Sequence, residues 1–230
     1  MPCFISAGAL SFGPHSRITV LGNCSLTAVA SRDIVIYSNT SVTSVSVNMT
    51  AAGNITIIGT LTSSGLGPLA GVGAPSTIGQ GASYGGSGGR AQCDGYFSNA
   101  VHQIGSINVN ADWYLPTNIN PTYGSGGGGQ YGGRGGGRII LRARRSLNVR
   151  KSGSILATGS SASEQNYGGG SGGSIAIFAY NITLSGNVSV KGGDGFQGSP
   201  AGGGGRVLLD VSILLFISII CLVLMFVFIL

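Results

Sequence analysis

Charged residues are scarce in this chain of 230 residues, and acidic ones are the scarcest. Only 8% of the residues are charged, so the chain lacks the composition of a charge-rich disordered tail. The six acidic residues lie far apart in the sequence: Asp33, Asp94, Asp112, Glu164, Asp194 and Asp210. Acid–base catalysis and Ca²⁺ binding need clustered carboxylates, so we expect no enzyme, no catalytic residue and no cofactor. Asp194 is the one candidate for a carboxylate pair, because stacking of successive layers of the chain would bring it near Glu164.

Metal-binding and redox residues are few as well. The four cysteines form no Cys-X-X-Cys or Cys/His pattern, so no zinc site is expected: Cys3, Cys24, Cys93 and Cys221. Cys24 and Cys93 are a candidate disulfide pair outside the cell, although the sequence does not fix the pairing. His15 and His102 stand alone and are predicted to be loop or surface residues. Trp113 and its neighbour Tyr114 are predicted in a loop, as a packed anchor or as sugar-binding aromatics.

Glycine is abundant, at 43 residues, and short apolar runs separate the glycine clusters. Leu, Ile and Val occur in runs of the length of strands, bounded by turn residues, which predicts an all-β protein. Three segments share one pattern: "GRIILRA" from Gly137, "GSIAIFA" from Gly173 and "GRVLLDV" from Gly205. Their apolar residues alternate and so lie on one face of a strand. We therefore predict that Ile139, Ile175 and Val207 share one interior column.

A second pattern of two short strands around a corner follows the first. It occurs as "ITLSGNVSV" from Ile182, "LNVRKSGSILA" from Leu147, "ITIIGTLTS" from Ile55 and "ITVLGNCSLTA" from Ile18. Units this short bury their apolar residues only by stacking on one another.

Residues 1–210 are therefore predicted to form an all-β, right-handed parallel β-helix-like solenoid with Gly-rich loops, the handedness following the usual rule for parallel crossovers. The tract from Tyr123 to Arg138 has two possible conformations: a loop protruding from the coil, or extended glycine layers packed within it.

The glycine-containing blocks resemble a known family. "GGGGQYGGRGGGRIILRA", "YGGGSGGSIAIFAYNITLSGNVSVKGGDG" and "GGGGRVLLDV", in that order, resemble blocks of the large glycine-rich surface proteins of land plants and several protists. The likeness covers roughly Ile55 to Val211 and includes the stretch from Leu61 to Gly95, which is similar to that family's linker. The resemblance implies an extracellular β-helix-like array of no established activity, of which this chain is a fragment.

The C-terminal segment 211–230, "VSILLFISIICLVLMFVFIL", contains no charge. As a helix of about 1.5 Å per residue it would span about 30 Å, the thickness of a bilayer core, which predicts one C-terminal hydrophobic transmembrane helix. Three interpretations stay open: a membrane anchor, a removed glycolipid-attachment signal with small residues at Ala201–Gly204, or a translated intron.

Two signals oppose each other on orientation. All basic residues precede the hydrophobic segment, which favours a cytosolic placement. Six Asn-X-Ser/Thr sequons favour the secretory side and are candidate glycosylation sites: Asn23, Asn39, Asn48, Asn54, Asn181 and Asn187. We expect a membrane protein whose strand region is extracellular or lumenal.

Seven of the twelve basic residues fall between Arg134 and Lys151. The RGG-like stretch in this region permits nucleic-acid binding, and binding of an acidic glycan or lipid is a further alternative. A solvated strand face explains the pattern better, because Arg142 and Arg144 alternate with apolar residues. The alignment predicts cation–π contacts of Arg142 with Phe178 and of Arg144 with Tyr180.

These observations predict a structural or adhesive glycine-rich cell-surface repeat protein, anchored in a membrane. The alternative is a carbohydrate-binding or carbohydrate-cleaving β-helix protein. Its expected partners are the membrane, through the C-terminal segment, and glycans or other surface proteins; nucleic acid is not expected.

Overall fold

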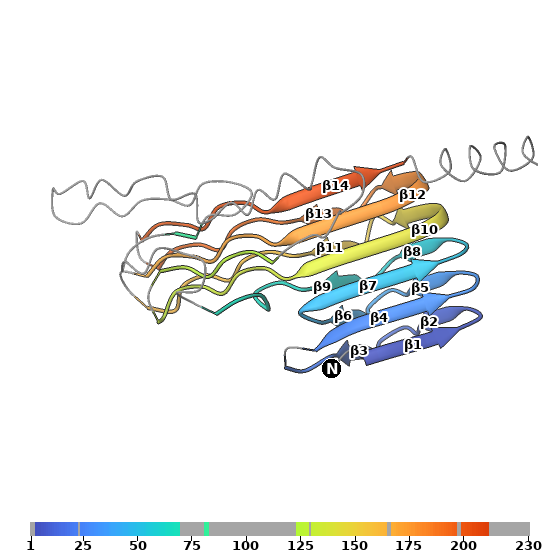
Figure 1. The fold of residues 1–230 in the computed structure, drawn as a ribbon, viewed down its shortest axis with the longest axis horizontal. Coiled ribbons are helices and arrows are strands. Elements are labelled where there is room, and N and C mark those ends of the chain that lie inside the picture. Colours follow the sequence, from blue (N-terminus) through green and yellow to red (C-terminus); the bar gives the residue numbers. More distant parts are fainter. Residues whose placement is uncertain are drawn as a thin grey trace, which may run out of the picture.

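The computed structural model describes residues 3–22, 24–69, 81–82, 123–128, 130–164, 167–196 and 199–211. These residues form strands and contain no helix (Figure 1). The strands are Cys3–Ala7 (β1), Leu10–Phe12 (β2), Arg17–Thr19 (β3), Ser25–Ala30 (β4), Ile34–Ile36 (β5), Ser41–Thr43 (β6), Ser46–Ala51 (β7), Ile55–Ile57 (β8), Thr60–Thr62 (β9), Arg138–Val149 (β10), Ser154–Leu156 (β11), Ser174–Leu184 (β12), Asn187–Ser189 (β13) and Arg206–Asp210 (β14).

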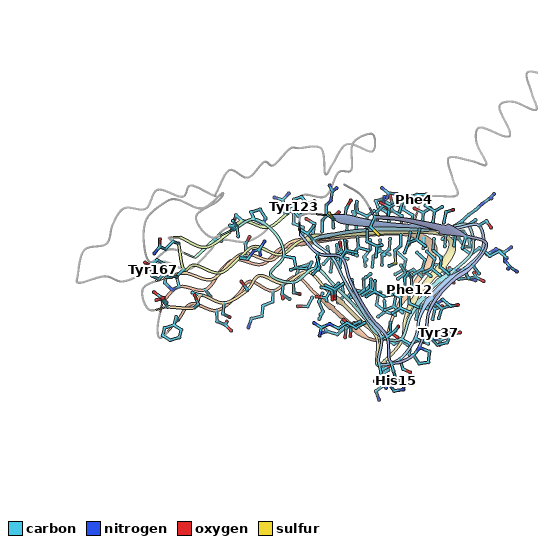
Figure 2. All side chains as sticks on the ribbon, turned by 90° about the horizontal axis from the view of Figure 1, so that it is seen from below. Phe4, Phe12, His15, Tyr37, Tyr123 and Tyr167 are labelled. Carbon is cyan, nitrogen blue, oxygen red and sulfur yellow. The ribbon has the colours of Figure 1, made fainter. Side chains whose placement is uncertain are left out.

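All strand pairs are parallel and belong to two sheets. The nine-stranded sheet has the order β1-β4-β7-β10-β8-β5-β2, with β12 pairing both β10 and β14. The five-stranded sheet has the order β13-β11-β9-β6-β3. Strand β10 joins two ladders, because its first half pairs β7 and its last residues pair β8. The nine-stranded sheet thus bends back on itself, and with the five-stranded sheet it surrounds the apolar side chains (Figure 2).

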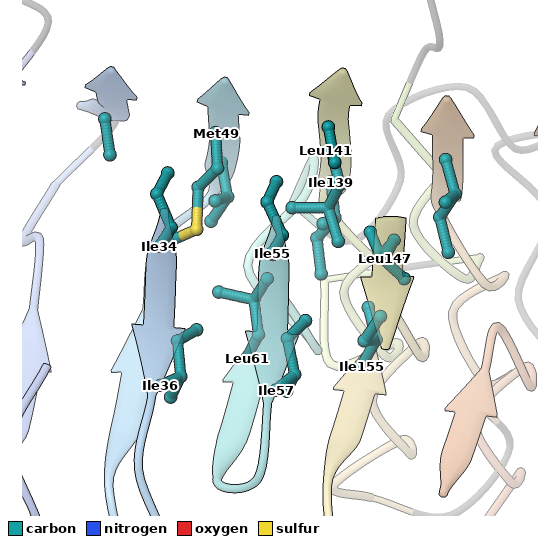
Figure 3. Close-up of a cluster of buried hydrophobic side chains, with 14 of the residues drawn as sticks. Ile34, Ile36, Met49, Ile55, Ile57, Leu61, Ile139, Leu141, Leu147 and Ile155 are labelled. Carbon is teal, nitrogen blue, oxygen red and sulfur yellow. The ribbon is translucent and has the colours of Figure 1, made fainter. Parts of the chain in front are cut away.

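The core consists of aligned columns of inward-facing side chains. Ile139 pairs with Val47 on one side and with Ile175 on the other, and all three are fully buried. Figure 3 shows Ile139 and Leu141 of β10 pointing into the same interior as Leu61 and Ile155. Val207 pairs with Ile175, so Ile139, Ile175 and Val207 are aligned as predicted. Val207 is nevertheless 43% exposed, so the buried part of this column ends at Ile175.

One of the four predicted corner patterns is out of register. The copies beginning at Ile55, Leu147 and Ile182 lie side by side in the nine-stranded sheet. Ile18 instead pairs with Val42 in the five-stranded sheet, so "ITVLGNCSLTA" is not a fourth copy. Period-two alternation is the same on both sheets, and for this reason the pattern could not distinguish them.

The tract from Tyr123 to Arg138 forms extended layers and does not protrude as a loop. Its amides donate to two neighbouring segments: Gly133 and Gly136 to the carbonyls of Gly168 and Ser171 (both 2.9 Å), and Gly135 to the Pro68 carbonyl (3.1 Å). We call the described residues of 123–137, 157–173 and 190–205, with 63–68, the glycine bundle. It continues directly into β10, β12 and β14 (Figure 1).

Apart from Gly65, the described glycines of the bundle are needed for space and not for unusual backbone angles. Among the glycines of the described residues, positive φ angles occur at Gly22 and Gly65. At Gly133, Gly170 and Gly172, an added Cβ would instead overlap a carbonyl oxygen of a neighbouring segment. Backbones that pack this closely exclude every residue with a Cβ atom.

The predicted fold class, a right-handed β-helix-like solenoid with a C-terminal hydrophobic helix, is wrong. The described residues form parallel sheets, one of them nearly closed, and no helix. β10 and β12 run as single strands of 12 and 11 residues where separate short strands were expected. A regular solenoid would place similar lengths of chain between paired strands. Here the lengths are very different, since Val47 pairs with both Leu26 and Ile139. The alternation predicted the strands correctly, but pairing and strand length depend on contacts distant in sequence.

The transmembrane prediction is corrected in the same way. Of segment 211–230, only Val211 is among the described residues, and the rest of that prediction lies outside them. Within the part of the chain that the structure describes, no helix is long and apolar enough to cross a membrane. The described residues also show no regular repeat, because the lengths of chain between paired strands are unequal.

Candidate functional site

The outward face of β10 carries a row of arginines that face neighbouring strands. Alternation turns Ile139 and Leu141 inward and leaves Arg138 and Arg142 outward. Arg138 Nε donates to Ser46 Oγ of β7 at 2.7 Å.

Arg142 Nη1 donates to Asn48 Oδ1 on the same strand β7, at 3.2 Å. The two guanidinium groups are thereby held against β7, Arg138 on its register partner Ser46 and Arg142 on Asn48, two residues before its partner Thr50.

Aromatic rings complete both arginine sites. The guanidinium carbon of Arg138 lies 5.2 Å from the ring centroid of Tyr123, and that of Arg142 lies 4.9 Å from the ring centroid of Phe178. The predicted contact of Arg142 with Phe178 is confirmed. Tyr123 as the partner of Arg138 was not predicted, because the two residues lie in different elements.

The predicted contact of Arg144 with Tyr180 is wrong. The β10–β12 register shifts between Ala143 and Ser146, so Arg144 and Tyr180 do not pair. Both side chains are exposed, and Arg144 makes no aromatic contact among the described residues.

Burial shifts the chemistry of Arg142. Ile140, Ala176 and Phe178 form a second buried apolar cluster on the outward side of the sheet, with Leu208 packed against it. Arg142 lies beside this cluster, and desolvation lowers the pKa of its guanidinium below its ordinary value. The guanidinium nevertheless stays charged at neutral pH.

A pocket opens where the chain passes from β9 into the glycine bundle. We call it the junction pocket; its volume is about 380 Å³. Apolar side chains provide most of its wall, and Arg134 provides the charge. Its lining residues are Val45, Leu66, Gly67, Pro68, Leu69, Tyr123 and Arg134.

Arg134 is held in the pocket wall by both its backbone and its side chain. Its amide donates to Ser160 Oγ at 2.7 Å, which fixes the backbone within the bundle. Its Nη2 donates to the Gly67 carbonyl at 3.1 Å. Its Nε is buried and has no hydrogen-bond partner among the described residues. The RGG-like stretch pointed to this arginine but gave no indication of a pocket.

A wider hollow lies at the ends of β1, β4, β7 and the middle of β10. Its volume is about 660 Å³, and Ser6, Ser31, Thr50, Arg142 and Arg144 supply its polar lining. Both of its arginines were predicted to lie on a solvated face. Arg144 is exposed as predicted, whereas Arg142 is half-buried.

The six candidate glycosylation sites differ in accessibility. Asn39, Asn181 and Asn187 are exposed, and Asn23 lies outside the described residues. The Asn48 side chain accepts from Arg142, and the Asn54 side chain bonds Asp33 and Ser146. Engaged amides of this kind are poor acceptors for a bulky glycan in the folded protein.

Stacking places Asp194 beside the segment that leads to Glu164. The Asp194 carbonyl accepts the Ala162 amide at 3.0 Å, and the Asp194 amide donates to Ser161 Oγ. The Asp194 carboxylate itself forms an exposed salt bridge with Lys191 at 3.3 Å. Glu164 is exposed. Among the residues that the structure describes, no three His, Cys, Asp or Glu side chains cluster as metal ligands would.

The remaining candidates are dispersed. Cys3 is exposed and Cys24 is half-buried, and both are free thiols. His15 is an exposed corner residue with a φ angle of 59°. Several residues singled out above lie outside the described part: Cys93, Asp94, His102, Asp112, Trp113, Tyr114 and Cys221.

None of the family models, curated proteins or solved structures compared with this chain matches it. The resemblance to glycine-rich surface proteins therefore stays a prediction.

Proposed function

We propose that the protein is a structural or adhesive scaffold that acts in the extracellular or lumenal space. The observation that carries this proposal is the glycine bundle, in which backbones pack directly against backbones. Ordering the backbone of one residue costs about 1–2 kcal/mol of conformational entropy, and glycine loses the most conformational freedom on folding. A flexible linker would leave its glycines disordered, so the ordered packing indicates a rigid structural role.

The hydrogen bonds of the bundle support a rigid role. The amides of Gly170 and Gly172 donate to the carbonyls of Ser160 (3.0 Å) and Gly203 (2.9 Å). The Gly193 amide donates in turn to the Gly170 carbonyl at 2.8 Å. Bonds of this kind tie each extended segment to neighbours on several sides. The bundle thus extends the parallel sheets as a stiff body.

Hydrogen–deuterium exchange of the full chain tests this proposal. The amides of Gly133, Gly170 and Gly172 should be as well protected as those of the central strand β10, because the same cooperative unit holds both. Exposed Gly22, whose surroundings are open, serves as the internal control and should exchange fast. If the amides of the bundle glycines exchange as fast as that of Gly22, the bundle is not rigid and the scaffold proposal is wrong.

A further inference from the structure

We infer that the junction pocket binds a small aromatic carboxylate. Its volume of about 380 Å³ lies in the range of small-molecule sites, which are mostly apolar with a few placed polar groups. Val45, Leu66, Pro68 and Tyr123 supply apolar surface for a ring. Arg134 supplies the charged group that orients it.

The hydrogen-bonding state of Arg134 favours an anionic ligand. Only its Nη2 is engaged, with the Gly67 carbonyl, while its Nε is buried and without a partner among the described residues. A guanidinium matches a carboxylate in charge and geometry, and the resulting bonds are stronger than those between neutral groups. A carboxylate in the pocket would give the guanidinium of Arg134 an anionic partner.

The surroundings of Tyr123 also favour negative charge. The guanidinium of Arg138 lies over the Tyr123 ring and adds a second positive charge beside the pocket. Within the described ranges, neither Arg134 nor Arg138 has a carboxylate partner. The local charge is therefore positive and attracts an anionic ligand.

The pocket lining favours an aromatic acid over a sugar acid, because it offers few polar side chains. Among the described residues of the lining, Arg134 and Tyr123 are the ones whose side chains carry polar atoms. Each sugar hydroxyl would need its own partner on burial, whereas a ring needs only apolar contact. The pocket chemistry thus fits one ring and one carboxylate.

Calorimetric titration of the full chain with 4-hydroxycinnamate tests the inference. We expect saturable binding, at least tenfold weaker for 4-hydroxycinnamamide, which has the same shape without the charge. Equal affinity for acid and amide, or tighter binding of galacturonate, would overturn it. N-acetylphenylalanine presents the same chemistry as a peptide C-terminus. If N-acetylphenylalanine binds more tightly than 4-hydroxycinnamate, the inference holds and the natural ligand is the C-terminus of a protein. If it binds more weakly, the inference holds and the natural ligand is a free aromatic acid.

Variants locate the binding. Arg134→Gln should weaken 4-hydroxycinnamate binding at least tenfold, while Arg150→Gln, at an exposed corner, should leave it unchanged. Leu69 is 61% exposed at the pocket wall, so its replacement does not disturb the core. Leu69→Glu should weaken binding several-fold more than Leu69→Gln. Wild-type affinity in Arg134→Gln, or equal effects of the two Leu69 variants, would show that the ligand does not occupy this pocket.

Discussion

The guanidinium of Arg142 lies over the ring of Phe178, 4.9 Å from its centroid, at paired positions of β10 and β12. The contact is half-buried beside an apolar cluster, where cation–π interactions are stronger than at exposed sites. We expect a coupling energy of about 0.5–2 kcal/mol between Arg142→Met and Phe178→Leu in a double-mutant cycle. The measurement is urea unfolding of wild type, both single variants and the double variant. Strictly additive effects would show that the stacking contributes nothing.

The lowered pKa of Arg142 has a defined sign. Desolvation disfavours the charged form in the folded state, so the penalty is present below the folded pKa and is relieved only as pH rises through it. Because the guanidinium remains charged far above neutral pH, this group should add no pH dependence to stability between about pH 5 and 9. Wild type and Arg142→Met should therefore have parallel pH–stability profiles. A difference in slope within that range would contradict this expectation.

Substitution of Gly172 should destabilise the glycine bundle. A Cβ there would overlap the Val190 carbonyl oxygen, and the backbones on both sides are fixed by hydrogen bonds. We expect Gly172→Ala to lower the free energy of unfolding by about 1–3 kcal/mol or more. Gly13→Ala is the matched control, because no atom lies within 4 Å of its added Cβ. Equal unfolding midpoints for the two variants would show that the close packing is not required.

Leu61 occupies the centre of an interior column. It is fully buried and pairs with Val42 and Ile155 on the neighbouring strands. Leu61→Ala should lower the free energy of unfolding by about 2–5 kcal/mol, because a cavity replaces the side chain. Thr60 is the adjacent outward residue, and Thr60→Ala should change stability by less than about 0.5 kcal/mol. A larger effect at Thr60 would mean that the inward and outward faces are reversed.

Asp33 connects two corners of neighbouring layers. Its Oδ1 accepts the Asn54 amide at 2.6 Å and the Asn54 Nδ2 at 3.0 Å. Asp33→Ala leaves both donors without this acceptor and should lower the free energy of unfolding by about 1–3 kcal/mol. Asp33→Asn keeps an oxygen in place and should lose less. Chemical denaturation at neutral pH distinguishes the two, and equal losses would assign the effect to the charge of Asp33.

The register between β10 and β12 decided which of the predicted cation–π contacts form. The alternation in "GRIILRA" and "GSIAIFA" was sufficient to predict Arg142 beside Phe178, since both follow the glycine by the same number of residues. The same count failed two residues later, because the ladder shifts between Ala143 and Ser146 and separates Arg144 from Tyr180. The junction pocket was beyond any such count. It joins Val45, Tyr123 and Arg134, which only folding brings together.

By itself, the sequence determined that the chain forms strands and which side chains face inward, because alternation is a local property of an extended backbone. It also required that backbones approach closely or turn sharply at the glycines, without indicating which. Only the tertiary structure decided that Gly133 and Gly170 pack against other backbones, that β10 runs through as one long strand, and that Ile18 belongs to the five-stranded sheet. Each of these outcomes depends on hydrogen bonds to segments distant in sequence, whose identity no local pattern encodes.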